Sequence, residues 1–151
     1  MNTTVAKLQV PHNRMHMKGK TQEMQQPSNY ENVTTELRDF FIQKIDECKR
    51  AGINDVIIDP GFGFGKTISH NFTLLKELSV FKMLEKPIMA GLSRKSTIYK
   101  TLGITAEEAL NGSTVLHTLA LQNGANILRV HDVKEAKEVI ALWERYEKTP
   151  S

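Results

Sequence analysis

The segment DVIIDPGFGFGKTISHN, Asp55–Asn71, combines an apolar run, three glycines and a Lys-Thr pair, which is the composition of a phosphate-binding loop. A P-loop requires four residues between its two glycines, so that successive backbone N–H groups surround a phosphate. Only three residues separate Gly61 from Gly65, and the dinucleotide-binding spacing G-x-G-x-x-G also fails, because glycines alternate with phenylalanines. The segment therefore does not predict a nucleotide site, and we expect no nucleotide cofactor.

Asp59 is the candidate ligand-binding residue of this segment. It ends an apolar strand, so its carboxylate should be partly desolvated and in need of hydrogen-bond donors. A planar ligand with two adjacent N–H groups would satisfy it through charge-assisted bonds. The alternative is a carboxylate that caps amides of its own loop. The glycines permit close backbone approach, while Phe62 and Phe64 either offer a flat apolar surface to a ring or anchor the loop in the core.

Two further motifs carry cations just beyond apolar segments. GLSRKS places Arg94 and Lys95 before a helical stretch, where two cations and helix N-terminal amides suit an anion or a carbonyl; a solvated turn is the alternative. RVHD places Arg129 and His131 two residues apart on a strand, hence on one side, where they suit a diphosphate or carboxylate. His131 could instead pair only with Asp132 or the backbone. The remaining histidines lack metal-ligand spacing, and no metal site is predicted in this chain.

The elements that position these motifs are short apolar strands. DVIID (Asp55–Asp59), PIMAG (Pro87–Gly91) and NILRV (Asn126–Val130) have the pattern of buried parallel strands. VPHNRMHM (Val10–Met17) is a weaker fourth candidate, because Asn13 and Arg14 interrupt it. All four motifs follow the carboxyl ends of these strands, where parallel α/β proteins build their sites.

Amphipathic helices are predicted between the strands, over residues 32–51, 71–84, 105–124 and 132–148. Thr105 and Glu108 have the spacing of a capping box, and Asp132 is placed to cap the last helix. We expect Trp143 to pack into the core. Four β–α units imply parallel strands with right-handed crossovers, in an open sheet or in part of a barrel. A (β/α)₈ barrel of about 250 residues has roughly 30 per unit, so the chain corresponds to about half a barrel.

The bulk composition excludes several classes of protein. With 151 residues and 40% apolar content, the chain fits one domain of soluble globular type. Its net charge of +3 is small and its charges are interleaved, which disfavours nucleic-acid partners. The single cysteine, Cys48, excludes an internal disulfide and is expected to be half-buried. No apolar run approaches a membrane span and no signal peptide is recognised, so we expect a cytoplasmic protein. Residues 1–9 and 148–151 are expected to be poorly ordered.

The motifs MHMKG, DPGFGFGK, GLSRKS and NGSTVLHTLALQNGANILRVHDV, in this order, resemble the C-terminal half of dihydropteroate synthase, from about Val5 to Trp143. That family is a pterin-binding (β/α)₈ TIM barrel of folate biosynthesis. It condenses 6-hydroxymethyl-7,8-dihydropterin diphosphate with para-aminobenzoate, giving 7,8-dihydropteroate and diphosphate. The resemblance implies an α/β fold made of the C-terminal half of this barrel, four β–α units, as a single partial domain over residues 1–151.

The resemblance also implies roles for the pterin-facing residues. Asp59 would hold the amino-pyrimidine edge of the pterin, with Met15 and Gly91 lining that slot. Lys95 would reach the pterin and the incoming amine, and it is one of two expected catalytic residues. Gly63 is expected among the substrate-binding residues.

The remaining roles concern the second substrate and the leaving group. Phe64, Arg94 and Ser96 would seat para-aminobenzoate. Arg129 and His131 would bind the diphosphate, and Arg129 is the second expected catalytic residue. Mg²⁺ is expected for the family, with its protein ligand in the N-terminal half that this sequence lacks.

Three hypotheses follow from the resemblance. The chain is a truncated or half-length dihydropteroate synthase that carries half of the active site and is inactive alone, or a non-enzymatic half-barrel, either degenerate or pterin-binding. A methyltetrahydrofolate methyltransferase is the third, which SRKS and RVHD disfavour because those motifs suit diphosphate and para-aminobenzoate. A half-barrel has open strand edges and an exposed concave face, so we expect a homodimer or a domain-swapped assembly.

Overall fold

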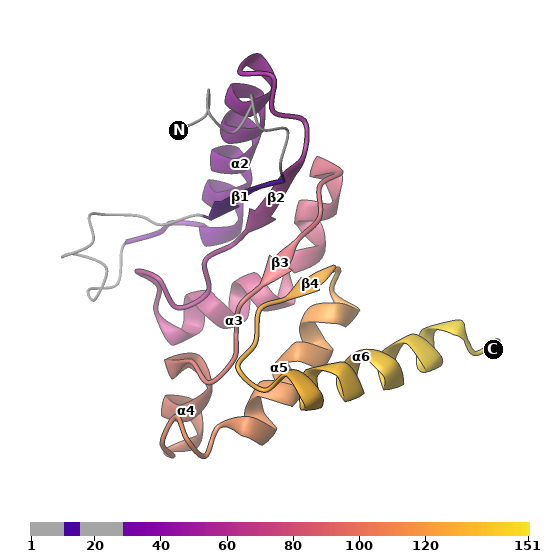
Figure 1. The fold of residues 1–151 in the computed structure, drawn as a ribbon. Coiled ribbons are helices and arrows are strands. Elements are labelled where there is room, and N and C mark those ends of the chain that lie inside the picture. The colour runs from indigo at the N-terminus through magenta and orange to yellow at the C-terminus, as the bar shows by residue number, and fades with distance from the viewer. Residues whose placement is uncertain (1–10, 16–28) are drawn as a thin grey trace.

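The computed structural model describes residues 11–15 and 29–151. Its four strands are parallel and lie side by side in chain order: β1 (His12–Met15), β2 (Val56–Asp59), β3 (Met89–Ala90) and β4 (Ile127–Leu128) (Figure 1). An isolated parallel bridge between Ile58 and Ile88 joins the β1–β2 pair to the β3–β4 pair. The predicted alternation of strands and helices is therefore confirmed for the described part of the chain. The expectation for residues 1–9 lies outside the described residues.

Strand β1 forms even though polar residues interrupt its sequence. Arg14 pairs in register with Ile58, and its Nε donates to the Sγ of Cys48 at 3.2 Å. Asn13 lies on the opposite face of the strand, with its Nδ2 3.9 Å from the Sδ of Met89. Cys48 is fully buried, which corrects the expectation of a half-buried thiol: the arginine stem of β1 and the surrounding core both cover it.

Helix α2 (Val33–Arg50) follows the predicted span closely. Asn32 is its N-cap and accepts a hydrogen bond from the backbone N of Thr35 at 3.0 Å. The helix ends before Gly52, whose φ of 79° only glycine adopts without strain. Its predicted apolar face is buried against the sheet, through Val33, Leu37, Phe41 and Cys48.

The segment after β2 forms two helices rather than the single predicted one. Thr67 is the N-cap of helix α3 (Ile68–Lys76) and forms a capping box with His70, and the 3₁₀ helix η1 (Leu78–Leu84) follows. Side chains three residues apart share a face in a 3₁₀ helix. Leu78 and Phe81 have this spacing, and both are fully buried.

Helix α4 (Ser96–Leu102) and helix α5 (Leu110–Gln122) follow β3. The carboxylate of Glu108 accepts from the N–H of Thr105, as the predicted capping box requires, but the predicted helix start at Thr105 is wrong. The guanidinium of Arg94 donates hydrogen bonds to the carbonyl oxygens of Ala106 and Glu107. Arg94 therefore binds the turn that precedes α5, whose first residue is Leu110.

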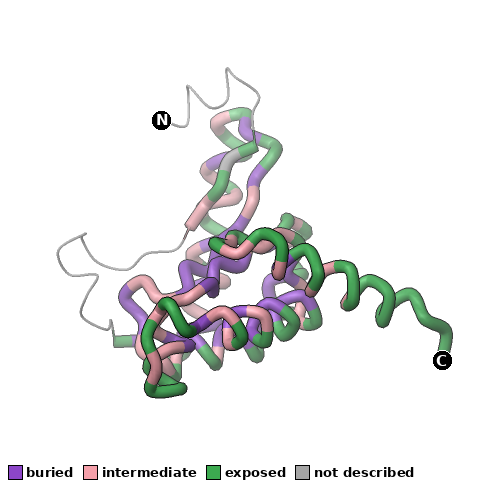
Figure 2. Tube along the Cα trace, turned by 60° about the horizontal axis from the view of Figure 1, so that its bottom comes forward, coloured by how far each residue is buried: buried purple, intermediate pink, exposed green. Residues whose placement is uncertain are grey.

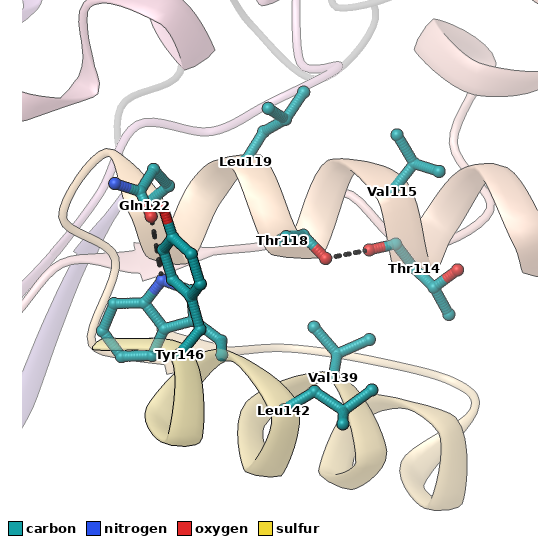
Figure 3. Close-up of a pocket in the computed structure, with 9 residues that line it drawn as sticks. Thr114, Val115, Thr118, Leu119, Gln122, Val139, Leu142 and Tyr146 are labelled. Atoms are coloured by element: carbon teal, nitrogen blue, oxygen red, sulfur yellow. Dashed lines mark hydrogen bonds between the residues drawn. The ribbon is translucent and has the colours of Figure 1, made fainter. Parts of the chain in front are cut away.

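Helix α6 (Val133–Lys148) packs on α5 and projects from the rest of the fold, with most of its surface exposed (Figures 1 and 2). Trp143 is half-buried, so the prediction that it packs into the core is wrong. It lines an apolar groove of about 550 Å³ between α5 and α6, where its Nε1 donates to Gln122 (Figure 3). Within the described residues, no helix combines the length and hydropathy needed to cross a membrane.

Candidate active site

The carboxylate of Asp59 lies at the carboxyl end of β2 and is fully buried. Its Oδ1 accepts a hydrogen bond from the backbone N of Gly61 at 2.9 Å, so the loop-capping alternative accounts for one oxygen. Its Oδ2 lies 3.0 Å from Nη1 of Arg129. This ion pair lacks hydrogen-bond geometry, and Oδ2 accepts no hydrogen bond from the described residues. One buried carboxylate oxygen thus retains its capacity to bind a donor.

Arg129 reaches Asp59 across a glycine. Its backbone N donates to the carbonyl of Ala90, which places it directly beyond β4. A Cβ on Gly91 would lie 2.6 Å from Nη2 of Arg129, so a side chain at position 91 would displace the guanidinium. Gly91 therefore leaves room for the Arg129 side chain beside Asp59, and its role in lining a pterin slot stays a prediction.

Lys95 enters the same site from the loop after β3. Its Nζ donates to the carbonyl of Phe62 at 2.6 Å and lies 4.8 Å from the centre of the Phe64 ring. A Cβ on Gly63 would be 3.3 Å from Cδ of Lys95. Burial, with the charge of Arg129 adding to it, lowers the pKa of Lys95 to about 8, while Asp59 opposes the shift.

The two phenylalanines divide the roles proposed for them. Phe62 is fully buried and anchors the loop in the core, whereas Phe64 is half-buried beneath the Lys95 ammonium. Phe64 is therefore the ring that remains available to a flat ligand.

Lys66 and Asn71, neither of which was predicted as a site residue, hold this loop together. Nζ of Lys66 donates to the carbonyls of Gly61 at 3.0 Å and Phe64 at 3.2 Å, and burial lowers the pKa of Lys66 to about 8, against the opposing charge of Asp59. Asn71 accepts from the N–H of Gly63 at 2.8 Å and donates to Thr67. Lys66 attracted notice only as part of a false P-loop. Asn71 lies on a helix, and a single polar residue in a helical pattern does not indicate a contact with a distant loop.

Met15 is a register neighbour of Asp59, and Ser96 follows Lys95 in the sequence. Met15 pairs with Asp59 in the β1–β2 register, so the two side chains share a face of the sheet, and Met15 is half-buried. Ser96 is the first residue of α4 and is also half-buried.

Arg94 and His131 belong to a neighbouring cluster. The guanidinium of Arg94 forms a bidentate ion pair with Asp132, which raises the pKa of Arg94 and lowers the pKa of Asp132 through their hydrogen bonds. His131 Nδ1 lies 2.9 Å from Oγ of Ser93. Strand β4 ends before Arg129, so Arg129 turns to Asp59 while His131 contacts Ser93.

The arrangement suits a ligand with a planar donor edge and an anionic group. One carboxylate is surrounded by the cations of Lys66, Lys95 and Arg129, so the site carries excess positive charge. Residues 11–15 and 29–151 contain no group of three or more His, Cys, Asp or Glu side chains that could hold a metal ion.

Parallel β–α units with charged groups at the carboxyl ends of the strands define this chain as half of a (β/α)₈ barrel, with the candidate site on its rim. A family model described as pterin binding enzyme matches residues 1–131, and the chain belongs to this family.

Individual relatives agree with this assignment. Dihydropteroate synthase of Escherichia coli (strain K12) is 42% identical over 132 residues, covering 86% of this chain and 47% of the relative. The crystal structure of Yersinia pestis dihydropteroate synthase with a sulfonamide drug has a TM-score of 0.94 at 37% identity, covering 98% of this chain and 55% of that one. The crystal structure of Stenotrophomonas maltophilia dihydropteroate synthase has a TM-score of 0.95 at 37% identity, covering 99% of this chain and 58% of that one. The chain therefore spans about half the length of these relatives.

Proposed function

We propose that this chain carries half of a dihydropteroate synthase active site. The complete reaction would join 6-hydroxymethyl-7,8-dihydropterin diphosphate to para-aminobenzoate, with release of diphosphate. Membership of the pterin-binding family supports the proposal, together with relatives that are named for this enzyme. Because the chain spans about half of those relatives, we expect little or no turnover from it alone.

The open oxygen of Asp59 is the observation on which the proposal depends most. The ion pair with Arg129 offsets the charge of this buried oxygen, but Oδ2 accepts no hydrogen bond from the described residues, and a ligand N–H would supply one. The amino-pyrimidine edge of a pterin presents adjacent N–H groups that match a carboxylate. The half-buried face of Phe64 and the slot at Gly91 would accommodate flat rings beside it.

The chain's own residues would contribute positioning and charge. Asp59 would orient the pterin, and Arg129 and His131 would bind the diphosphate. As the methylene–oxygen bond breaks, its electron pair leaves with the diphosphate, and positive charge develops on the pterin methylene. The amine nitrogen of para-aminobenzoate then forms the new carbon–nitrogen bond and releases a proton. Lys95, near both substrates, would help to stabilise the departing anion.

Arg94 and Ser96 are the weaker part of the proposed para-aminobenzoate site. The Arg94 guanidinium already donates to Asp132 and to two carbonyls, so a carboxylate ligand would have to compete with these partners. We therefore propose Ser96 and Phe64 as the para-aminobenzoate contacts.

The deciding experiment is a synthase assay on the purified 151-residue chain, with and without an added N-terminal half from a dihydropteroate synthase. We expect turnover only with the added half. Robust turnover by the chain alone, with its mass confirmed, would contradict the half-site proposal. No turnover in either mixture would favour a non-enzymatic half-barrel.

Calorimetry with a dihydropterin tests whether a chain without turnover is a pterin-binding module. Binding that Asp59→Asn abolishes, without any turnover, would identify a pterin-binding module. Absence of dihydropterin binding by a folded chain would count against the whole proposal.

We also propose that two copies associate. Among the described residues, β4 pairs only with β3, so the other edge of β4 has no strand partner there. Half-buried Met89 and Ile127 share a register position on β3 and β4. Sedimentation at micromolar concentration tests this proposal, and a monodisperse monomer would contradict it. Mg²⁺ and a cytoplasmic location stay predictions of the sequence.

A further inference from the structure

Two consecutive residues of the loop after β3 pair with two consecutive residues of the loop after β4. Oγ of Ser93 accepts from the backbone N of His131 at 3.1 Å and lies 2.9 Å from its Nδ1. One residue further on, Arg94 donates to both oxygens of Asp132, at 2.7 and 3.0 Å. The loops are thus joined by two adjacent links, between segments 38 residues apart in the sequence.

Arg94 is engaged along its whole length. Its Nη1 donates to the carbonyls of Ala106 and Glu107, and its backbone N donates to Oγ of Ser113 at 2.9 Å. Ser113 is buried, and it donates in turn to the carbonyl of Ala109. Because the Arg94 guanidinium is hydrogen-bonded to Asp132, Ala106 and Glu107, we interpret Arg94 as a structural link between the loops.

The backbone of Arg94 shows what the link holds in place. Its φ is 53°, in the left-handed region, where a residue other than glycine is strained. Such a conformation persists only where surrounding contacts fix it. The next residue is Lys95, whose side chain turns into the site to reach Phe62 and the Phe64 ring. The direction of Lys95 therefore depends on the conformation of Arg94.

We propose that Asp132 is a positioning residue: by holding Arg94 in its left-handed conformation, it directs Lys95 into the candidate pterin site. This proposal rests on the proposed function only for the identity of the ligand. The link itself consists of contacts between residues of this chain, so it can be tested separately.

The first test substitutes Asp132→Asn in the full chain, which keeps the size of the side chain and removes its charge. The readout is the pH at which acetylation of Lys95 is half-maximal, followed by mass spectrometry. In the unsubstituted chain this midpoint should lie near the pKa of about 8. In the variant, Lys95 leaves its buried position and the midpoint moves toward the ordinary lysine value of about 10.4.

Asp46→Asn is the matched control, because Asp46 forms an ion pair with Arg50 within α2. We expect the Lys95 midpoint to stay unchanged in this variant. An unchanged midpoint in folded Asp132→Asn would overturn the proposal. If Asp132→Asn does not fold, Arg94→Lys serves instead, because it keeps the charge and loses the bidentate fork. A midpoint unchanged in folded Arg94→Lys would overturn the proposal equally.

A double substitution tests whether Asp132 acts through Arg94. Glycine adopts a positive φ without strain, so Arg94→Gly permits the backbone conformation and removes the link. Asp132→Asn should then have no further effect on the Lys95 midpoint in the Arg94→Gly background. An additive shift would show that Asp132 acts by another route and would overturn the proposal.

Titration with a dihydropterin tests the functional consequence. We expect about tenfold weaker binding in Asp132→Asn, the size of effect that losing a partly exposed charge-assisted hydrogen bond produces. A shifted Lys95 midpoint with dihydropterin binding unchanged would overturn the role of Asp132 in ligand binding. If the unsubstituted chain binds no dihydropterin, the proposed function fails, while the acetylation midpoints still decide whether Asp132 directs Lys95.

Discussion

Arg129 lies across Gly91, with its Nη1 3.0 Å from the buried Oδ2 of Asp59. The arginine side chain is 45% exposed, whereas the aspartate side chain is fully buried. The pair therefore forms a wall of the candidate site, with one member fixed in the fold and the other able to move. Substitutions of Asp59 and of Gly91 should therefore differ in their effects on ligand affinity and on the free energy of unfolding.

Gly91→Ala should weaken ligand binding with little effect on stability. The added Cβ would meet the mobile end of Arg129, which can move away into solvent. We expect about tenfold weaker binding of inorganic diphosphate, from the loss of one positioned charge-assisted contact, and a change of less than about 1 kcal/mol in the free energy of unfolding. Calorimetry and urea denaturation measure the two quantities.

Gly103→Ala is the control, and it should lower stability without weakening diphosphate binding. No atom lies within 4 Å of a Cβ at position 103, but its φ of 68° strains any other residue. We expect a loss of about 1 kcal/mol in stability and unchanged diphosphate binding. If Gly91→Ala resembled this control, the predicted displacement of Arg129 would be wrong.

Asp59→Asn should abolish recognition of the pterin. The amide keeps an acceptor for Gly61 N–H but turns a donor toward either Arg129 or the ligand, so we expect at least about a hundredfold loss of dihydropterin affinity. Stability should fall by roughly 1–3 kcal/mol, as for other broken buried polar contacts. Asp55→Asn, at an exposed position of the same segment, should leave both quantities unchanged. Equal losses of affinity in the two variants would argue against a specific role for Asp59.

The stability of the chain should rise between about pH 7.5 and 9.5. Burial lowers the folded-state pKa of Lys66 and of Lys95 to about 8, so in this range the unfolded chain binds more protons than the folded chain. Each lysine should then add about 2 kcal/mol to the free energy of unfolding across that range. Burial raises the pKa of Tyr30 to about 12, which reverses the trend above pH 10. Urea denaturation at a series of pH values measures the slope.

Lys66→Met should remove about half of this rise, because one of the two depressed lysines is gone. A slope identical to that of the unsubstituted chain would show that Lys66 is not titrating in this range. Lys76→Met, at an exposed helical position, is the matched control and should keep the full slope.

Asn71→Ala should destabilise the loop that carries Gly63. The substitution removes an acceptor from the N–H of Gly63 and a donor to the carbonyl of Thr67, at a position that is 2% exposed. We expect a loss of about 2–3 kcal/mol. Asn123→Ala, which removes one hydrogen bond to Leu75 at a half-buried position, should cost about 1 kcal/mol. Comparable losses in the two variants would indicate that Asn71 contributes no more than an ordinary hydrogen bond.

The amino-acid sequence by itself determined the order of the strands and helices and which strand ends carry charge. Asp59, Lys95 and Arg129 were predicted to share one rim, because parallel strands bring their carboxyl ends together. The buried face of α2 was predicted equally well, since burial against one sheet imposes a helical period on the residues. These features are local, or follow from a regular repeat.

Only the tertiary structure decided which partners the charged side chains take. Arg94 and Asp132 are 38 residues apart, and their ion pair removes Arg94 from the predicted anion site. The same guanidinium also donates to the carbonyl of Ala106, in the turn before α5. Lys66 donates to its own loop, and Asn71 holds that loop from a helix. The geometry of a hydrogen bond is fixed to within tenths of an ångström. A pattern of residue types places side chains only on a face or at an edge, so such pairings depend on the packed fold.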